Sequence, residues 1–246
     1  ALTGDESADP AHFASARLFH LYSEIHCDRE SLRVVADPLV AVRMLVKIAT
    51  GLDELDASAY LRQADEIFAR GPVKTDGLSH PEAFVRARAL RLWHERGVDS
   101  EASVREMIEG PPALEELDLL GRTEAALRTR HLIDEMLSLS WMRTDNALAH
   151  ARLYFPDYVP EPPPANDDRR DAYVADAGLR DAFSYVLLDF ATVDRSLEEA
   201  PLAAALEVAE RWGFKERFSE LARKELRLRK KQLDDLDREK TARLTQ

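Results

Sequence analysis

The chain has 246 residues, 45% of them hydrophobic and 33% charged, so it can bury a core beneath a well-solvated surface. Its net charge of −12 excludes a general nucleic-acid-binding protein, because phosphate contacts need clustered Lys and Arg. The one cysteine, Cys27, excludes an intramolecular disulfide, and the sequence holds no run of about 18 apolar residues that could span a membrane. With no export signal at its start, the sequence predicts a cytoplasmic location.

Apolar residues recur at helical spacing along most of the chain, and few segments alternate as strands do. This pattern predicts an all-α fold, a helical bundle in two parts. The predicted helices cover, in order, about 13–35, 38–50, 57–70, 81–96 and 101–109, one or two helices within 114–151 separated or bent near Gly121, then 171–189, 197–212 and 215–240.

Local signals set several of these boundaries. Asp37 can cap the helix that Pro38 begins, and Gly51 is placed to end it. Ser196 and Glu199 have the spacing of a capping box, and Gly213 follows as a stop.

Five prolines within residues 154–166 exclude a continuous helix there, so we place a domain boundary at this segment. The predicted organisation is a helical domain over 1–112, a helical extension over 113–153, a Pro-rich linker over 154–170 and a helical domain over 171–246.

The first predicted helix carries the chemistry of most interest. Glu24 and Asp28 are four residues apart, so both carboxylates lie on one helical face. A zinc-binding carboxylate with a second acid that orients a neighbouring ligand would use this spacing, although acidic pairs on wet helix surfaces are common. His20 and His26 are left out of the predicted site, and Cys27 is expected to be a small buried residue.

Three elements in order resemble the second half of HtpX/BepA-type zinc metallopeptidases, the gluzincins of metallopeptidase family 48. They are E-I-H-C-D-R at 24–29, D-P-L-V-A-V-R-M-L-V-K-I-A-T-G at 37–51 and L-S-H-P-E-A-F-V-R at 78–86. The first resembles the family's E-x-x-x-D helix, and the third its S-x-H-P-x-x-x-x-R element. The resemblance covers residues 13–96 and implies that domain 1–112 is the helical C-terminal part of a metallopeptidase domain.

The resemblance also implies roles for four residues. Glu24 would be the third protein ligand of the zinc, and Asp28 would orient a neighbouring ligand. His80 would be the zinc-proximal histidine, a fourth ligand or a gate, and Arg86 its supporting cation. Each has a plainer reading as a surface acid, a residue before a helix or a solvated arginine.

The chain departs from the family in one essential motif, the H-E-x-x-H helix that supplies two zinc ligands and the general base. His94-Glu95 does not continue into that motif, so this chain alone should be inactive. We expect the motif to lie upstream, as the start at Ala1 rather than Met favours, or to have been lost.

A second acidic group surrounds a predicted turn in the last domain. Asp189, Asp194 and Glu199 could bind a divalent cation through oxygen ligands, or could serve as turn, cap and helix-dipole residues. Residues 172–232 resemble TerB-like helical domains, although Phe190 replaces the usual glycine, and that resemblance implies an interaction role.

Three functions follow as hypotheses. The first is the C-terminal portion of a zinc-dependent metalloendopeptidase, acting on a protein or peptide substrate and fused to a helical domain whose C-terminal helices bind a protein partner. The second is a non-catalytic helical scaffold with a vestigial peptidase half. The third is a divalent-cation sensor built on Asp189 and Asp194.

Overall fold

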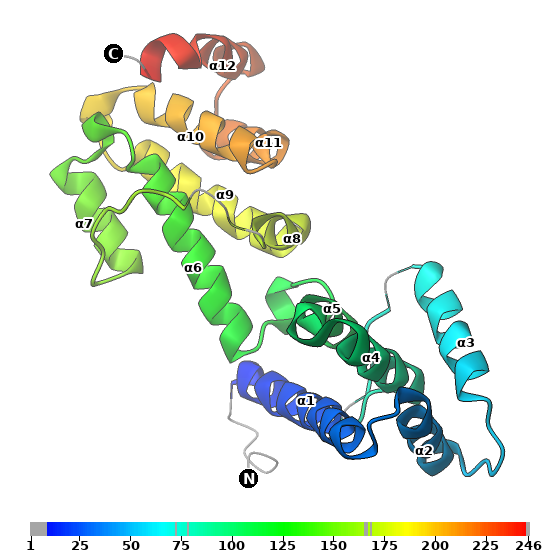
Figure 1. The fold of residues 1–246 in the computed structure, drawn as a ribbon. Helices are drawn as coiled ribbons and strands as arrows, with labels where there is room; N and C mark the ends of the chain where they lie inside the picture. The colour runs from blue at the N-terminus through cyan, green and yellow to red at the C-terminus, as the bar shows by residue number, and fades with distance from the viewer. Residues whose placement is uncertain (1–8, 72, 78, 165–166, 168, 245–246) are drawn as a thin grey trace. The chain divides into compact units, whose positions relative to one another are not determined.

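The structure, a computed structural model, describes residues 9–71, 73–77, 79–164, 167 and 169–244. Over these residues it consists of helices and connecting segments without a strand, so the predicted all-α class is confirmed (Figure 1). The chain divides into two compact units, residues 1–111 and 112–246.

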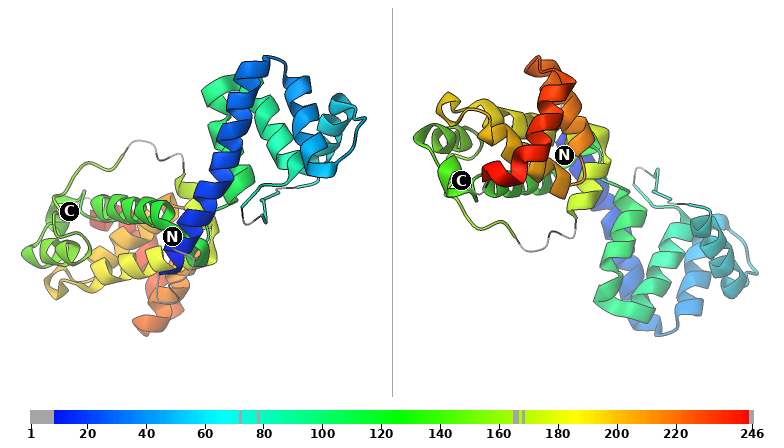
Figure 2. Two further views of the ribbon diagram at one scale, coloured as in Figure 1. Left: turned by 90° about the horizontal axis from the view of Figure 1, so that it is seen from below. Right: turned by 90° about the horizontal axis from the view of Figure 1, so that it is seen from above.

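The first unit is organised around one helix. Its elements are α1 (Pro10–Val35), α2 (Pro38–Thr50), α3 (Ala57–Ala69), α4 (Ala83–Arg96), the 3-10 turn η1 (Gly97–Ser100) and α5 (Glu101–Glu109). The central helix α4 packs against α1, α2, α3 and α5 (Figures 1 and 2).

Capping side chains explain where the first helices begin. The carboxylate of Asp37 accepts hydrogen bonds from the backbone N–H groups of Leu39 and Val40, and Gly51 ends α2 in the left-handed conformation at φ 73°. Asp56 caps α3 in the same way as Asp37 caps α2. The predicted start and end of the second helix are therefore confirmed.

Two apolar clusters form the core of the first unit. One joins α1, α2, α3 and α4 around Val42 and Val46, and the other joins α1, α4 and α5 around Leu21, Val85 and Ile108. The buried stripe of α1 is Leu21, Ile25, Asp28 and Leu32. Asp28 is thus a carboxylate set within an otherwise apolar helix face.

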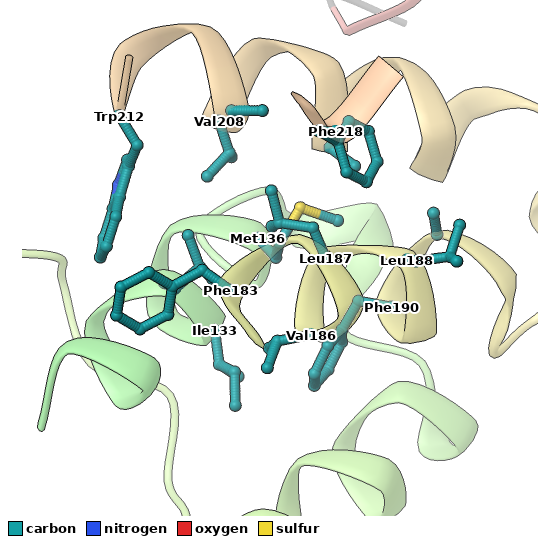
Figure 3. Packing of buried hydrophobic residues seen from close by; sticks show 14 of the residues in the cluster. Ile133, Met136, Phe183, Val186, Leu187, Leu188, Phe190, Val208, Trp212 and Phe218 are labelled. Atoms are coloured by element: carbon teal, nitrogen blue, oxygen red, sulfur yellow. The ribbon is translucent and has the colours of Figure 1, made fainter. Parts of the chain in front are cut away.

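The second unit holds a larger core. Its elements are η2 (Leu114–Glu116), α6 (Leu119–Met136), η3 (Ser140–Met142), α7 (Asp145–Tyr154), α8 (Arg170–Ala175), α9 (Ala177–Thr192), η4 (Arg195–Leu197), α10 (Ala200–Arg211), α11 (Lys215–Glu225) and α12 (Lys230–Leu244). The helix α9 packs against α6, α8, α10 and α11. Figure 3 shows Ile133 and Met136 of α6 facing Phe183 and Leu187 of α9 in this core.

Beyond the end of α7 at Tyr154, the described residues 155–164 of the Pro-rich segment have no helical structure. Tyr158 is buried, and its hydroxyl donates to the carboxylate of Asp134 in α6 at 2.6 Å. The backbone N–H of Glu161 donates to the same carboxylate at 3.3 Å. These contacts hold the Pro-rich segment against α6. The boundary of the two units lies between Pro111 and Pro112, so the predicted segments 113–153, 154–170 and 171–246 all fall within the second unit.

Several predicted helix boundaries in the second unit are wrong. Gly121 lies inside the first turn of α6, where its N–H donates to the capping Asp118, and the break comes instead at residues 137–144. The predicted helix 171–189 is interrupted at Asp176, and the predicted helix 215–240 at residues 226–229, where Arg227 adopts a φ of 55°.

The predicted capping box is also wrong, because α10 begins at Ala200 and Ser196 lies in η4. Asp194 is the side chain that caps this turn. Among the helices of the described residues, none combines the length and the apolar character needed to cross a membrane.

Candidate functional site

Four side chains from two distant segments meet at the junction of α1 and α4. Glu24 and Asp28 lie one turn apart on α1, His80 precedes α4, and Arg86 lies near its start. One carboxylate oxygen of Glu24, Oε1, is 3.0 Å from Nδ1 of His80, and the other, Oε2, is 3.0 Å from Nη1 of Arg86. The structure therefore brings together the four residues that the resemblance singled out.

Arg86 bridges the two acids of α1. Its Nε and Nη2 donate to the two carboxylate oxygens of Asp28 at 2.8 and 2.7 Å, a forked geometry that only the guanidinium provides. Burial raises the pKa of the Asp28 carboxyl, and the hydrogen bonds from Arg86 oppose that rise. The same hydrogen bonds raise the pKa of Arg86, which stays charged.

Exposure changes steadily across this cluster. The side chain of His80 is 67% exposed, that of Glu24 29% and that of Asp28 11%. Glu24 is therefore the acid that a ligand could reach from solvent, while Asp28 and Arg86 form the layer beneath it.

The donor set fits a zinc ion only in part. Two ligands bound at about 2.0 Å in a tetrahedral site lie roughly 3.3 Å apart, close to the 3.0 Å between Glu24 and His80. The carboxylate of Asp28 is hydrogen-bonded to Arg86. The described residues contain no group of three His, Cys, Asp or Glu side chains able to hold a metal. Glu24 and His80 could supply two positions, whereas a catalytic zinc normally has three protein ligands.

The neighbouring residues of α1 lie outside this contact. His20 and His26 are exposed, and the ring of His20 meets that of Phe19 edge to face. Cys27 is exposed as well, so its predicted burial is wrong. The reason is angular, because Cys27 lies about 100° around the helix from the buried stripe that contains Asp28.

The second acidic group is engaged in local hydrogen bonds. Asp189 accepts a hydrogen bond from the hydroxyl of Tyr154 at 2.6 Å. Asp194 accepts from the backbone N–H and the hydroxyl of Ser196, at 3.0 and 2.6 Å, and these bonds lower its pKa to about 2. Because Asp194 is a turn cap, and the described residues include no three-residue metal group, the cation hypothesis gains no geometry in its favour.

Sequence reasoning missed the residues that hold the loop before His80. Arg17 of α1 donates to the carbonyl oxygens of Thr75 and Gly77, and Thr75 donates to Glu82. Arg17 lies seven residues before Glu24, which places both on one face of α1. That spacing was the available signal, but nothing in the sequence tells which backbone carbonyls an arginine will meet.

A comparison with known proteins finds one informative relative. Over 84 residues the chain is 36% identical to the plastoglobule-localized metallopeptidase 48 of Arabidopsis thaliana, a chloroplast protein by its name. Part of this chain is related to a metallopeptidase. The match spans 29% of this chain and 24% of that metallopeptidase. No protein-family model and no solved structure matches the chain, and the similarity to TerB-like domains stays a prediction.

Proposed function

We propose that this chain is the C-terminal portion of a zinc-dependent metalloendopeptidase. Its first unit contributes Glu24 as a carboxylate ligand, and the H-E-x-x-H segment lies outside these 246 residues. The observation that carries the proposal is the meeting of Glu24, Asp28, His80 and Arg86, whose two segments are more than 50 residues apart in the chain. The partial match to a metallopeptidase supports the same reading.

Within this proposal each residue has a physical task. Arg86 fixes the Glu24 carboxylate from the buried side, and Asp28 keeps Arg86 in place through two hydrogen bonds. His80 approaches Glu24 from the solvent side and can act as a ligand or gate there. A zinc ion at such a site would polarise a peptide carbonyl and activate water, chemistry that these residues alone do not supply.

The second unit would serve as an interaction domain. We propose that this TerB-like part binds a protein partner through its C-terminal helices, in a cytoplasmic setting. The exposed, mixed-charge surface of α12 supports this role, with basic and acidic side chains such as Lys230, Lys231 and Asp234.

The proposal is tested by extending the chain. The coding sequence on the N-terminal side of Ala1 should encode an H-E-x-x-H, and the longer protein should bind one zinc per chain and cleave unfolded casein. Glu24→Gln should lower zinc affinity at least about tenfold, the loss typical of a weakened metal site. Glu30→Gln is the matched control, since Glu30 is an exposed acid on the same helix.

Two outcomes would overturn the proposal. One is the absence of H-E-x-x-H from the upstream coding sequence. The other is a longer protein whose zinc content does not change when Glu24 is replaced.

A non-catalytic scaffold is the second candidate, and one observation favours it. Both oxygens of Glu24 and both oxygens of Asp28 are paired with His80 or Arg86 inside this chain. Each carboxylate oxygen of the cluster therefore has a partner without a metal, as in a vestigial site. An upstream sequence lacking H-E-x-x-H supports this candidate.

A further inference from the structure

The segment that carries His80 is anchored at a buried threonine. Thr75 is completely buried, although it lies between α3 and α4, outside any helix. Its backbone N–H donates to the carbonyl of Met107 in α5 at 3.0 Å, and its hydroxyl donates to the carboxylate of Glu82 at 2.5 Å. The other oxygen of that carboxylate accepts the N–H of Asp76 at 3.1 Å. This end of the loop is thereby tied to α5 and to the start of α4.

Arg17 ties the same loop to α1. Its Nη2 donates to the carbonyl of Thr75 at 2.8 Å, and its Nε donates to the carbonyl of Gly77 at 3.0 Å. A forked donor of this kind fixes two successive points of a backbone and not just one. Arg17 and Glu24 are seven residues apart, so they share a helix face about 10 Å apart along the axis.

Gly77 lets the loop pass close to the backbone of His80. A Cβ atom at Gly77 would lie 2.0 Å from the carbonyl oxygen of His80, a separation that no side chain could occupy. The obstacle is backbone, so a larger residue would have to displace His80 itself. The close approach therefore requires glycine at this position.

The contact between Glu24 and His80 is weak by itself. The His80 side chain is 67% exposed, and an exposed pair gains little because solvent screens it and ordering the side chains costs entropy. The Glu24–His80 contact therefore cannot hold a free loop in place.

We propose that Arg17, Thr75 and Gly77 are positioning residues that hold His80 against Glu24. The inference deepens the proposed function and rests on it for the meaning of the Glu24–His80 contact. Arg17 fixes the loop on α1 two turns before Glu24. The close approach of Gly77 to the His80 backbone then places the imidazole beside the Glu24 carboxylate. His80 is placed by the loop that precedes it and not by its own attraction to Glu24.

The test measures the contact directly in the full chain without metal. With histidine labelled with carbon-13 and nitrogen-15, the nuclear Overhauser effect between the His80 ring and the Glu24 side chain reports the paired form. Arg17→Met should lower the ratio of paired to unpaired His80 about tenfold, the factor expected when a charge-assisted hydrogen bond is lost. Gly77→Ala should lower the same ratio, because its Cβ would displace the His80 backbone. Arg17→Lys keeps the charge but cannot fork, so it should restore the contact in part.

Matched controls separate positioning from general stability. Arg33→Met removes an exposed arginine of the same helix that pairs with Glu30, and Ser79→Ala alters an exposed residue of the same loop. Both should leave the cross-peak unchanged. Urea unfolding of every variant shows which ones remain folded, and Gly77→Ala and Arg17→Lys decide the question if Arg17→Met does not fold.

A folded Arg17→Met or Gly77→Ala protein with an undiminished His80–Glu24 cross-peak would overturn the inference. So would the absence of that cross-peak from the unmodified chain. Because no metal enters the measurement, it can succeed where the zinc test fails, or fail where that test succeeds.

Discussion

Asp28 shows how a single charged residue can organise a site. It occupies a position of the buried α1 stripe, between Ile25 and Leu32, where a carboxylate would be costly without a partner. Arg86 meets both of its oxygens and also reaches Glu24. The charge beneath the site is thus balanced within the chain, and the geometry of Glu24 depends on that balance.

Replacing Arg86 with methionine should therefore destabilise the first unit. The change leaves Asp28 without the partner that balances its buried charge, and breaking such a pair costs roughly 2–4 kcal/mol once the partial exposure of Arg86 is discounted. The free energy of unfolding, measured by urea denaturation, checks this. The double variant Arg86→Met/Asp28→Leu should recover most of the loss, because no unpaired charge remains.

The exposed arginine of the same helix provides the comparison. Arg33→Met breaks a solvent-exposed pair with Glu30 and should change stability by less than about 0.5 kcal/mol. Equal losses in Arg33→Met and Arg86→Met would contradict the special role of the buried pair.

At the residue scale, the sequence predicts which side chains form the cluster, but not the contacts that hold the cluster in place. The identities of Glu24, Asp28, His80 and Arg86 followed from motif resemblance, and the structure places them together. Their roles toward a metal stay predictions. The contacts of Arg17 go to backbone carbonyls, which every residue carries, so its spacing from Glu24 could point to the residue but not to its acceptors.

At the scale of elements, the division between α8 and α9 depends on one side chain. Asp176 separates the two helices, and its Oδ1 accepts the backbone N–H of Leu179 at 2.8 Å. The same oxygen accepts the N–H of Leu114 at 3.2 Å, which ties η2 to the start of α9. One carboxylate thus begins a helix and fixes the entry segment of the second unit.

We expect Asp176→Ala to lower the free energy of unfolding of the second unit by about 1–2 kcal/mol, because a helix cap and a second backbone hydrogen bond are lost together. Urea denaturation followed by circular dichroism measures the change. Asp171→Ala is the control, since that acid is 88% exposed and should contribute almost nothing. A loss in Asp171→Ala as large as that in Asp176→Ala would contradict the argument.

The helix interruptions at Asp176 and at residues 226–229 could not be predicted from the sequence. Apolar residues keep helical spacing across both breaks, so periodicity alone reads each pair of helices as one. At Asp176 a residue common in surface helices acts as a cap, and at Arg227 a residue without special backbone freedom turns the chain at φ 55°. Where Asp37-Pro38 and Gly51 gave clear signals, the prediction is confirmed.

At the scale of the whole molecule, the two units bury separate cores. The buried residues of the first unit's clusters lie within 21–108, and those of the second unit's cluster lie within 117–236. Each unit therefore has its own source of stability, as an independent domain requires.

A core change in one unit should consequently leave the other intact. Phe190 is fully buried in the second unit, and Phe190→Ala should cost that unit about 3–5 kcal/mol. In a Trp93→Phe background the remaining tryptophan emission reports only the second unit, while circular dichroism reports both. The unfolding midpoint followed by tryptophan emission should move to a lower urea concentration. The unfolding curve followed by circular dichroism should separate into two transitions, one for each unit.

Tyr185→Ala, an exposed position of the same helix, is the control and should shift neither signal appreciably. A single dichroism step that moves together with the emission in Phe190→Ala would show that the units unfold as one.

The exposure of Cys27 has a practical consequence. It is the one thiol in the chain, and it lies three residues along α1 from Glu24. A maleimide dye would therefore attach at a single known position without any engineered residue. Its emission would then provide an optical signal from the immediate surroundings of that carboxylate as ions, peptides or partner chains arrive.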